Sequence, residues 1–291
     1  MGVILGRNNY GKSRVRLVKV TKHPDRHDMT DLSVDIQLQG DFLTAHTAGD
    51  NRNILPTDTM KNTVYALAKG ESIADPEIFG LMLAAHFLGH NPQVSEARIE
   101  LREHLWRRID VHGKPHRHSF ISRGNERRLA VVTQSRTASG IDTTVEAGIE
   151  ELLVLKTTDS GFVGYIKDPF TTLKETTDRI FSTVIAARWR YSSPEVDYGL
   201  YWHEVRRMVL ETFAQHHSLS VQQTVYAAGK LVLDTYPGIA EIRLSLPNKH
   251  CLLVNLEPFG MEYDNEIFVP TDEPHGLIEA TITRSADSTY N

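Results

Sequence analysis

Polar and apolar residues alternate with a period of two over residues 14–20, 32–38 and 96–109 of the chain. The clearest run places Leu32, Val34, Ile36 and Leu38 on one side. Alternation of this kind is typical of a β-strand with one buried face. These segments are therefore predicted to be strands, and a turn at residues 112–115 leads into a returning strand at 129–132.

Two helices are predicted between the second and third of these strands. Apolar residues at positions 60, 64, 67 and 68 share one stripe of a helix over residues 57–69. The next helix has Asp75 as its expected N-cap, Pro76 in its first turn and Gly89 at its end.

The second half of the chain repeats this order. Residues 152–156 and 184–191 are predicted to be strands, and apolar residues at 202, 205, 209 and 213 form a helical stripe. Ser220 is expected to cap a further helix. Residues 240–246 alternate again, and a turn at 247–249 is expected to lead into a last strand at 252–256.

Each half thus contains strand, strand, helix, helix, strand and strand. We predict an α+β protein of two similar units, residues 1–140 and 141–291, each an antiparallel sheet with its helices on one face. The boundary is expected in the Ser-, Gly- and Thr-rich stretch at 137–142. Such units leave sheet edges open, and a closed ring of several subunits would cover them.

Composition narrows the class of protein. Of 291 residues, 40% are hydrophobic and 24% are charged, which is ordinary for a globular protein. A net charge of −5 argues against a nucleic-acid partner, because nucleic-acid binders usually carry a basic excess. The single cysteine, Cys251, excludes an intrachain disulfide and any site of several cysteines.

Targeting signals are not evident in the sequence. The apolar run at residues 3–5 is too short for a signal-peptide core, and no stretch approaches the ~20 apolar residues of a membrane span. Residues 288–291 differ from the Ser-Lys-Leu peroxisomal address. We therefore expect a cytoplasmic protein with no membrane partner.

A histidine-rich segment offers one possible metal site. His116 and His118 lie two residues apart, so on a strand they would face the same side. Zinc needs at least a third ligand, which His104 or His86 could supply. The alternative is a polar hairpin whose histidines make hydrogen bonds or pack at an interface, and no metal is expected here.

Several other residues acquire meaning in combination. Lys12 precedes the first strand, and Thr57 and Asp58 open a helix, where they could cap it or leave free N–H groups for a polar ligand. Taken singly, Phe162 is typical of a core residue and Arg179 of a solvated charge. No nucleotide-binding, metalloprotease or serine-hydrolase motif is present.

In their order along the chain, these segments resemble the urate oxidase (uricase) family, whose members have the tunnelling fold. The resemblance covers about residues 5 to 285. The matching stretches are YGKSRVRLVKV (10–20), LPTDTMKNTVYALAK (55–69), HGKPHRHSF (112–120), FVGYIKDPFTTLKETTDRIFST (162–183), LSVQQTVY (219–226) and LPNKH (246–250).

The resemblance implies two tandem tunnelling-fold units per chain and a homotetramer that forms a hollow barrel. It implies that Arg179 and Gln222 bind opposite edges of urate and that Phe162 stacks on its ring. The amide of Val221 would assist Gln222. Thr57 and Asp58 would come from the neighbouring subunit, so that the site would exist in the oligomer.

The resemblance also implies a reaction without cofactor. Urate would be oxidised by O₂ to 5-hydroxyisourate and hydrogen peroxide. Lys12 would be the base, acting through the Thr57 hydroxyl with His250 as the third member of a proton relay. Asn248 and Thr57 would line the place where O₂, and later water, meets the ring.

Three alternatives remain open from the sequence. The chain could be a tunnelling-fold enzyme acting on pterins with zinc held by the histidine segment. It could be a purine-binding protein without catalytic activity on the same barrel. It could also be a redox enzyme with bound flavin, which would be yellow.

Overall fold

The structure is a computed structural model that describes residues 2–262 and 266–284. It divides into two compact units. Unit 1 comprises Met1–Gly148 and Arg190–Leu200, and unit 2 comprises Ile149–Trp189 and Tyr201–Asn291. The boundary predicted at 137–142 coincides with the turn between two long strands, and the division into units 1–140 and 141–291 stays a prediction. The peroxisomal-address comparison concerns residues 288–291, which lie outside the described residues.

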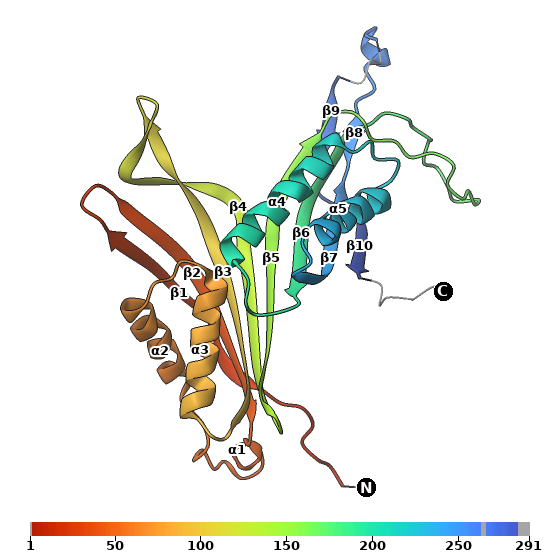
Figure 1. Ribbon diagram of the computed structural model, residues 1–291. Coiled ribbons are helices and arrows are strands. Elements are labelled where there is room, and N and C mark those ends of the chain that lie inside the picture. The colour runs from red at the N-terminus through yellow and green to blue at the C-terminus, as the bar shows by residue number, and fades with distance from the viewer. Residues whose placement is uncertain (1, 263–265, 285–291) are drawn as a thin grey trace, which may run out of the picture. The chain divides into compact units, whose positions relative to one another are not determined.

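Unit 1 is an antiparallel sheet with two main helices on one face (Figure 1). Its strands lie in the order β1-β2-β3-β4. The elements in chain order are β1 (Tyr10–Lys22), β2 (His27–Gly40), α1 (Leu43–Ala48), α2 (Thr57–Gly70), α3 (Pro76–His90), β3 (Val94–Val111) and β4 (Lys114–Thr137). The strand β5 (Gly140–Lys156) begins in this unit and continues past Gly148.

The core of unit 1 follows the predicted alternation. Leu38, Ile36 and Val34 of β2 pair with Ala97, Ile99 and Leu101 of β3, and all six are buried. Helix α3 packs on this face so closely that a Cβ atom at Gly80 would lie 2.9 Å from the side chain of Leu101. The predicted helix at 57–69 is confirmed, with Met60, Val64 and Ala68 buried.

Unit 2 also combines strands with helices. It contains most of β6 (Phe181–Tyr191) and α4 (Tyr198–Gln215), whose ends at residues 190–191 and 198–200 belong to unit 1, and all of α5 (Val221–Thr235), β7 (Ile239–Lys249) and β10 (Gly276–Thr283), with β7 and β10 antiparallel. A small hairpin of β8 (Cys251–Leu253) and β9 (Phe268–Pro270) is inserted between them, with a short 3₁₀ helix at Glu257–Phe259. Helix α5 packs on β7 and β10 (Figure 1).

Two details of the predicted fold are wrong. The expected turn at 247–249 belongs to β7, and the later strand that pairs with β7 is β10 instead of a strand at 252–256. Asp75 stands at the N-cap of α3 but makes no capping bond, because its carboxylate is paired with Arg128 at 3.0 Å. The cap predicted at Ser220 is confirmed: its hydroxyl accepts a bond from the N–H of Gln223.

The helices within residues 2–262 and 266–284 lack the combination of length and hydrophobicity that a membrane crossing requires.

Candidate active site

Five of the predicted substrate-binding residues line one small cavity in unit 2. The cavity has a volume of about 110 Å³ and is lined by Phe162, Arg179, Val221, Gln222, Asn248 and Ile278. These residues come from four separate segments of the chain. They combine one cation, two amide side chains and an aromatic ring, which is the set of groups that a flat, polar, anionic molecule requires.

Phe162 and Arg179 are held together by the backbone of the segment between β5 and β6. The N–H of Phe162 donates to the carbonyl of Thr176 at 2.7 Å, and the N–H of Thr176 donates back at 3.2 Å. The guanidinium of Arg179 lies 5.5 Å from the centre of the Phe162 ring. Burial lowers the pKa of Arg179. Because an arginine titrates so far above neutral pH, the group remains a cation.

The same segment is also tied to the start of α5. The N–H of Gly161 donates to the carbonyl of Ser218 at 2.8 Å. The hydroxyl groups of Ser218 and Thr224, both buried, are 2.7 Å apart. These contacts fix the first turn of α5, which carries Val221 and Gln222. Backbone N–H groups in a first turn have no acceptor within the helix, so they are available to a ligand.

Strand β7 supplies Asn248 to the cavity. Asn248 pairs with Gly276 and Leu246 pairs with Ile278, which brings β10 to the cavity wall. His250 follows directly after β7, and its carbonyl accepts a bond from the N–H of Thr271 at 2.8 Å. His250 is not among the residues that line the cavity.

Lys12, Thr57 and Asp58 lie in unit 1, on β1 and at the start of α2. A hydrogen bond joins their two segments: the hydroxyl of Tyr10 accepts from the N–H of Leu55 at 2.8 Å. The pKa of the exposed Asp58 carboxyl is lowered mainly by its hydrogen bond and charge interaction with Lys61, and further by the charge of Lys12.

Position 11, directly before Lys12 in the sequence, has no room for a side chain. A Cβ atom at Gly11 would lie 1.7 Å from the carbonyl oxygen of Ile36 on the neighbouring strand. Directly after Lys12 the register with β2 shifts, in a bulge that ends at Val15. Bulges of this kind redirect side chains and are common beside active sites.

The first turn of α2 is open to a ligand. Its N-cap is Pro56, and no side chain caps it. Of the two roles left open for Thr57 and Asp58, capping is not observed, because both residues lie inside the helix and the Asp58 carboxylate binds the side chains of Lys61 and Asn62. Uncapped N–H groups at the positive end of a helix favour an anionic or strongly polar ligand.

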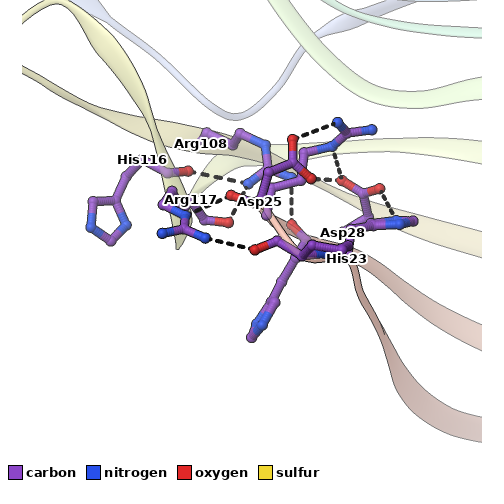
Figure 2. A network of polar contacts seen from close by, with 9 residues as sticks. His23, Asp25, Asp28, Arg108, His116 and Arg117 are labelled. Atoms are coloured by element: carbon purple, nitrogen blue, oxygen red, sulfur yellow. Dashed lines mark hydrogen bonds and ion pairs between the residues drawn. The ribbon is translucent and has the colours of Figure 1, made fainter.

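The histidine segment connects two hairpins of unit 1, as Figure 2 shows. Arg108 of β3 donates to the carbonyls of His116 and Arg117, and its guanidinium pairs with Asp28 at 2.6 Å. The rings of His116 and His118 are in contact, with centres 4.6 Å apart. Within residues 2–262 and 266–284, no group of three potential metal ligands is present. These contacts are of the kind expected for a polar hairpin, the alternative to a metal site.

The sequence reasoning missed two residues of the cavity region. The ring of Tyr165 stacks on Phe162 at 4.8 Å, nearly parallel at 11°. An aromatic residue three positions after Phe162 was a signal that could have indicated this pair. Ile278 lines the cavity, but its place depends on the pairing of β7 with β10, which no local pattern reveals.

Comparisons with known proteins identify the family of the chain. A family model described as Uricase matches residues 8–133 and 145–279. The chain is 49% identical to the uricase of Arthrobacter globiformis over 97% of this chain and 90% of that protein. It is 41% identical to the uricase of Dictyostelium discoideum, over 96% of each chain.

Solved structures show the same fold. The crystal structure of uricase from Arthrobacter globiformis superposes with a TM-score of 0.93 at 48% identity, covering 99% of this chain and 97% of that one. The fold and these matches define an enzyme of the oxidoreductase class. The relatives cover nearly the whole chain at high identity, and the chain belongs to the uricase family.

Proposed function

We propose that this enzyme oxidises urate with O₂, without metal or organic cofactor, to 5-hydroxyisourate and hydrogen peroxide in purine degradation. Urate loses two electrons, and O₂ takes up two electrons and two protons. The oxygen of one water molecule becomes the new hydroxyl group, so that urate, O₂ and water balance the two products. The observation that best supports this proposal is a single cavity lined by Phe162, Arg179, Val221, Gln222 and Asn248.

Substrate recognition is assigned to unit 2. The planar guanidinium of Arg179 can form two parallel hydrogen bonds to one edge of a urate anion. The side chain of Gln222 and the N–H of Val221 would pair with the opposite edge, and the ring of Phe162 would stack on the purine. The contact of Arg179 with Phe162 at 5.5 Å supports this assignment, because both groups are positioned around one small volume.

Proton transfer is assigned to Lys12, Thr57 and His250. Dioxygen is a triplet and reacts with an electron-rich urate dianion by single-electron steps. The task of the protein is therefore to remove a proton and to stabilise separated charge. Lys12 would act as the base through the Thr57 hydroxyl, and Asn248 would hold O₂ and then water above the ring. The open first turn of α2 supports a role for Thr57 and Asp58 beside an anionic ligand.

We further propose that the working enzyme is a cytoplasmic homotetramer, a barrel of tandem tunnelling-fold units, whose sites combine unit 1 of one subunit with unit 2 of a neighbour. Open sheet edges support this arrangement. Among the described residues, β1 pairs with β2 alone within unit 1, and β10 pairs with β7 alone within unit 2, which leaves one edge of each strand open. Pairing between subunits would cover these edges.

The decisive experiment supplies urate and air, and nothing else, to purified protein that has been treated with a chelator. We expect urate to be consumed with one equivalent of peroxide formed. Activity that returns when a divalent metal or a flavin is added back would reject the cofactor-free reaction. Urate binding without consumption of O₂ would favour the non-catalytic purine-binding protein.

A further inference from the structure

The guanidinium group of Arg179 has no polar side-chain partner to hold it. Within the part of the chain that the structure describes, it makes no hydrogen bond and no ion pair, and its contact is with the ring of Phe162. Burial lowers its pKa, and no neighbouring carboxylate opposes that effect. The direction of this side chain therefore depends on the backbone that carries it.

That backbone is held by the hydroxyl group of Thr176. The hydroxyl donates to the carbonyl of Asp178 at 2.7 Å and accepts from the N–H of Asp178 at 3.3 Å. These two bonds close a bend at residues 177–178, directly before Arg179. A threonine hydroxyl that bonds the backbone two residues ahead takes the place of a backbone turn. Thr176 thus fixes the point from which the side chain of Arg179 extends.

The backbone of Thr176 holds a second residue of the cavity. Its carbonyl accepts from the N–H of Phe162 at 2.7 Å, and its N–H donates to the carbonyl of Phe162 at 3.2 Å. The two segments lie so close that a Cβ atom at Gly161 would stand 3.2 Å from the carbonyl oxygens of Thr176 and Thr177. One residue is therefore bonded both to Phe162 and to the bend before Arg179, and these two residues line the same cavity.

The bend has a second anchor in the segment that follows β5. The hydroxyl of Thr158 donates to the carboxylate of Asp178 at 2.8 Å. Because this bond does not involve Thr176, loss of the Thr176 hydroxyl should loosen the bend without abolishing it. A change at Thr176 is therefore expected to weaken the function of Arg179 in part, and the chain should still fold.

We propose that Thr176 is a positioning residue for urate binding and that its hydroxyl group acts through Arg179. The inference rests on the proposed function, in which Arg179 forms two parallel hydrogen bonds to one edge of urate. Paired bonds of this kind require the guanidinium in one orientation. Without the hydroxyl, that orientation would be populated for a smaller fraction of the time, and the apparent affinity falls by the same fraction.

The first experiment replaces Thr176 by valine, which removes the hydroxyl and keeps the branched shape of the side chain. We expect KM for urate, and its dissociation constant measured without O₂, to rise roughly 2- to 10-fold, the scale of one net hydrogen bond. The value of kcat should stay nearly unchanged. Thr176→Ser restores a hydroxyl and should recover most of the parental affinity.

Thr177→Val is the matched control. Thr177 is the next residue of the same bend, is exposed, and has a hydroxyl group without a hydrogen bond among the described residues. This variant should bind urate like the parent. An equal loss of affinity in Thr176→Val and Thr177→Val, or no recovery in Thr176→Ser, would overturn the role of the Thr176 hydroxyl.

A double-mutant cycle tests whether the hydroxyl acts through Arg179. In the Arg179→Ala background, Thr176→Val should lower kcat/KM no further, because the group that it positions is absent. The same fold-change in both backgrounds would overturn the proposal, since a general structural role would add to the loss of Arg179. Thermal unfolding midpoints show that each variant is folded, and Thr176→Ala takes the place of Thr176→Val if the valine variant does not fold.

The parent enzyme and Arg179→Ala separate failure of this inference from failure of the proposed function. If the parent consumes urate and Arg179→Ala loses affinity, a parental KM in Thr176→Val would overturn the positioning role alone. A folded parent that neither binds nor consumes urate would overturn the proposed function and this inference together.

Discussion

The hydroxyl group of Tyr10 bonds to both backbone groups of Leu55, accepting from its N–H at 2.8 Å and donating to its carbonyl at 3.2 Å. Tyr10 opens β1 two residues before Lys12, and Leu55 lies two residues before Thr57. The Tyr10 ring packs edge-on against Phe42 at 4.8 Å, which holds the phenol in place. One side chain thus sets the spacing between the proposed base and the hydroxyl through which it acts.

Tyr10→Phe should separate these two segments. The loss leaves the half-buried N–H and carbonyl of Leu55 without their partner, which costs about 1 kcal/mol of unfolding free energy. We expect kcat to fall several-fold while KM for urate changes little. Urea unfolding and steady-state kinetics measure the two effects. Tyr65→Phe is the matched control, because its hydroxyl makes one longer contact, 3.4 Å, to the carbonyl of Arg16.

Lys12→Met and Thr57→Ala should each lower kcat by roughly 10²-fold or more, the scale of lost acid–base assistance. The binding of urate should be nearly preserved, since neither group is assigned to the substrate edges. Peroxide formation under air gives kcat, and equilibrium titration gives the affinity. Lys22→Met, at the exposed end of the same strand, should leave kcat unchanged. A Lys12→Met variant with the parental rate would remove lysine from the relay.

Arg179→Ala should act chiefly on substrate binding. Removing one partner of a buried charged pair costs about 2–5 kcal/mol, so kcat/KM should fall by roughly 30-fold or more. Titration with urate and steady-state kinetics test this directly. Arg243→Ala changes an exposed arginine paired with Glu279 and should behave like the parent. Equal losses in the two variants would point to charge in general instead of a specific contact.

Mixing two inactive variants tests whether a site is shared between subunits. Lys12→Met leaves unit 2 intact, and Arg179→Ala leaves unit 1 intact. If sites combine units from neighbouring chains, dissociating and reassembling the two variants together should restore peroxide formation that neither shows alone. The same treatment of each variant by itself is the control. No recovery, with mixed tetramers demonstrated by mass spectrometry, would place the complete site within one chain.

The buried pair of Glu77 and Arg128 predicts a pH-dependent stability. Burial raises the pKa of Glu77 to about 7, and this outweighs the attraction of Arg128, whose guanidinium lies 2.6 Å away. The stabilising contribution is complete below the ordinary pKa of 4.5 and is lost as the pH rises through about 7. The total is about 3 kcal/mol at 1.36 kcal/mol per pKa unit.

Glu77→Gln should remove this contribution to the slope. Urea unfolding between pH 4.5 and 8 should show the parent losing stability relative to the variant as the pH rises. Glu211→Gln, an exposed carboxylate on α4 paired with Arg207, should keep the parental profile. Parallel pH profiles of parent and Glu77→Gln would contradict the raised pKa.

Periodicity predicted the helices well but located some strands poorly. Helix α2 and the Ser220 cap depend on residues within a few positions of each other, so local patterns suffice. The composition of residues 247–249 is typical of a turn. Pairing of Pro247 with Leu277 and of Asn248 with Gly276 nevertheless keeps the chain extended there. That pairing joins segments some thirty positions apart and leaves no local signal.

The sequence predicted which residues belong to the candidate site, but it did not predict the contacts that hold them in place. The family resemblance indicated Phe162, Arg179 and Gln222 together, and these residues line one cavity. The bond between Tyr10 and Leu55 spans 45 positions and could not be anticipated. Asp75 illustrates the opposite failure: a local rule predicted a cap, but the buried charge of Arg128 was the stronger partner.

The close approach of β2 to Gly11 limits how this enzyme can be redesigned. With the Ile36 carbonyl 1.7 Å from where that atom would stand, even alanine must push two strands apart. A library randomised at that codon and selected for folded protein should return glycine, whatever is done to the neighbouring lysine. Here the main chain of one strand, and no side chain, determines how close its neighbour can come.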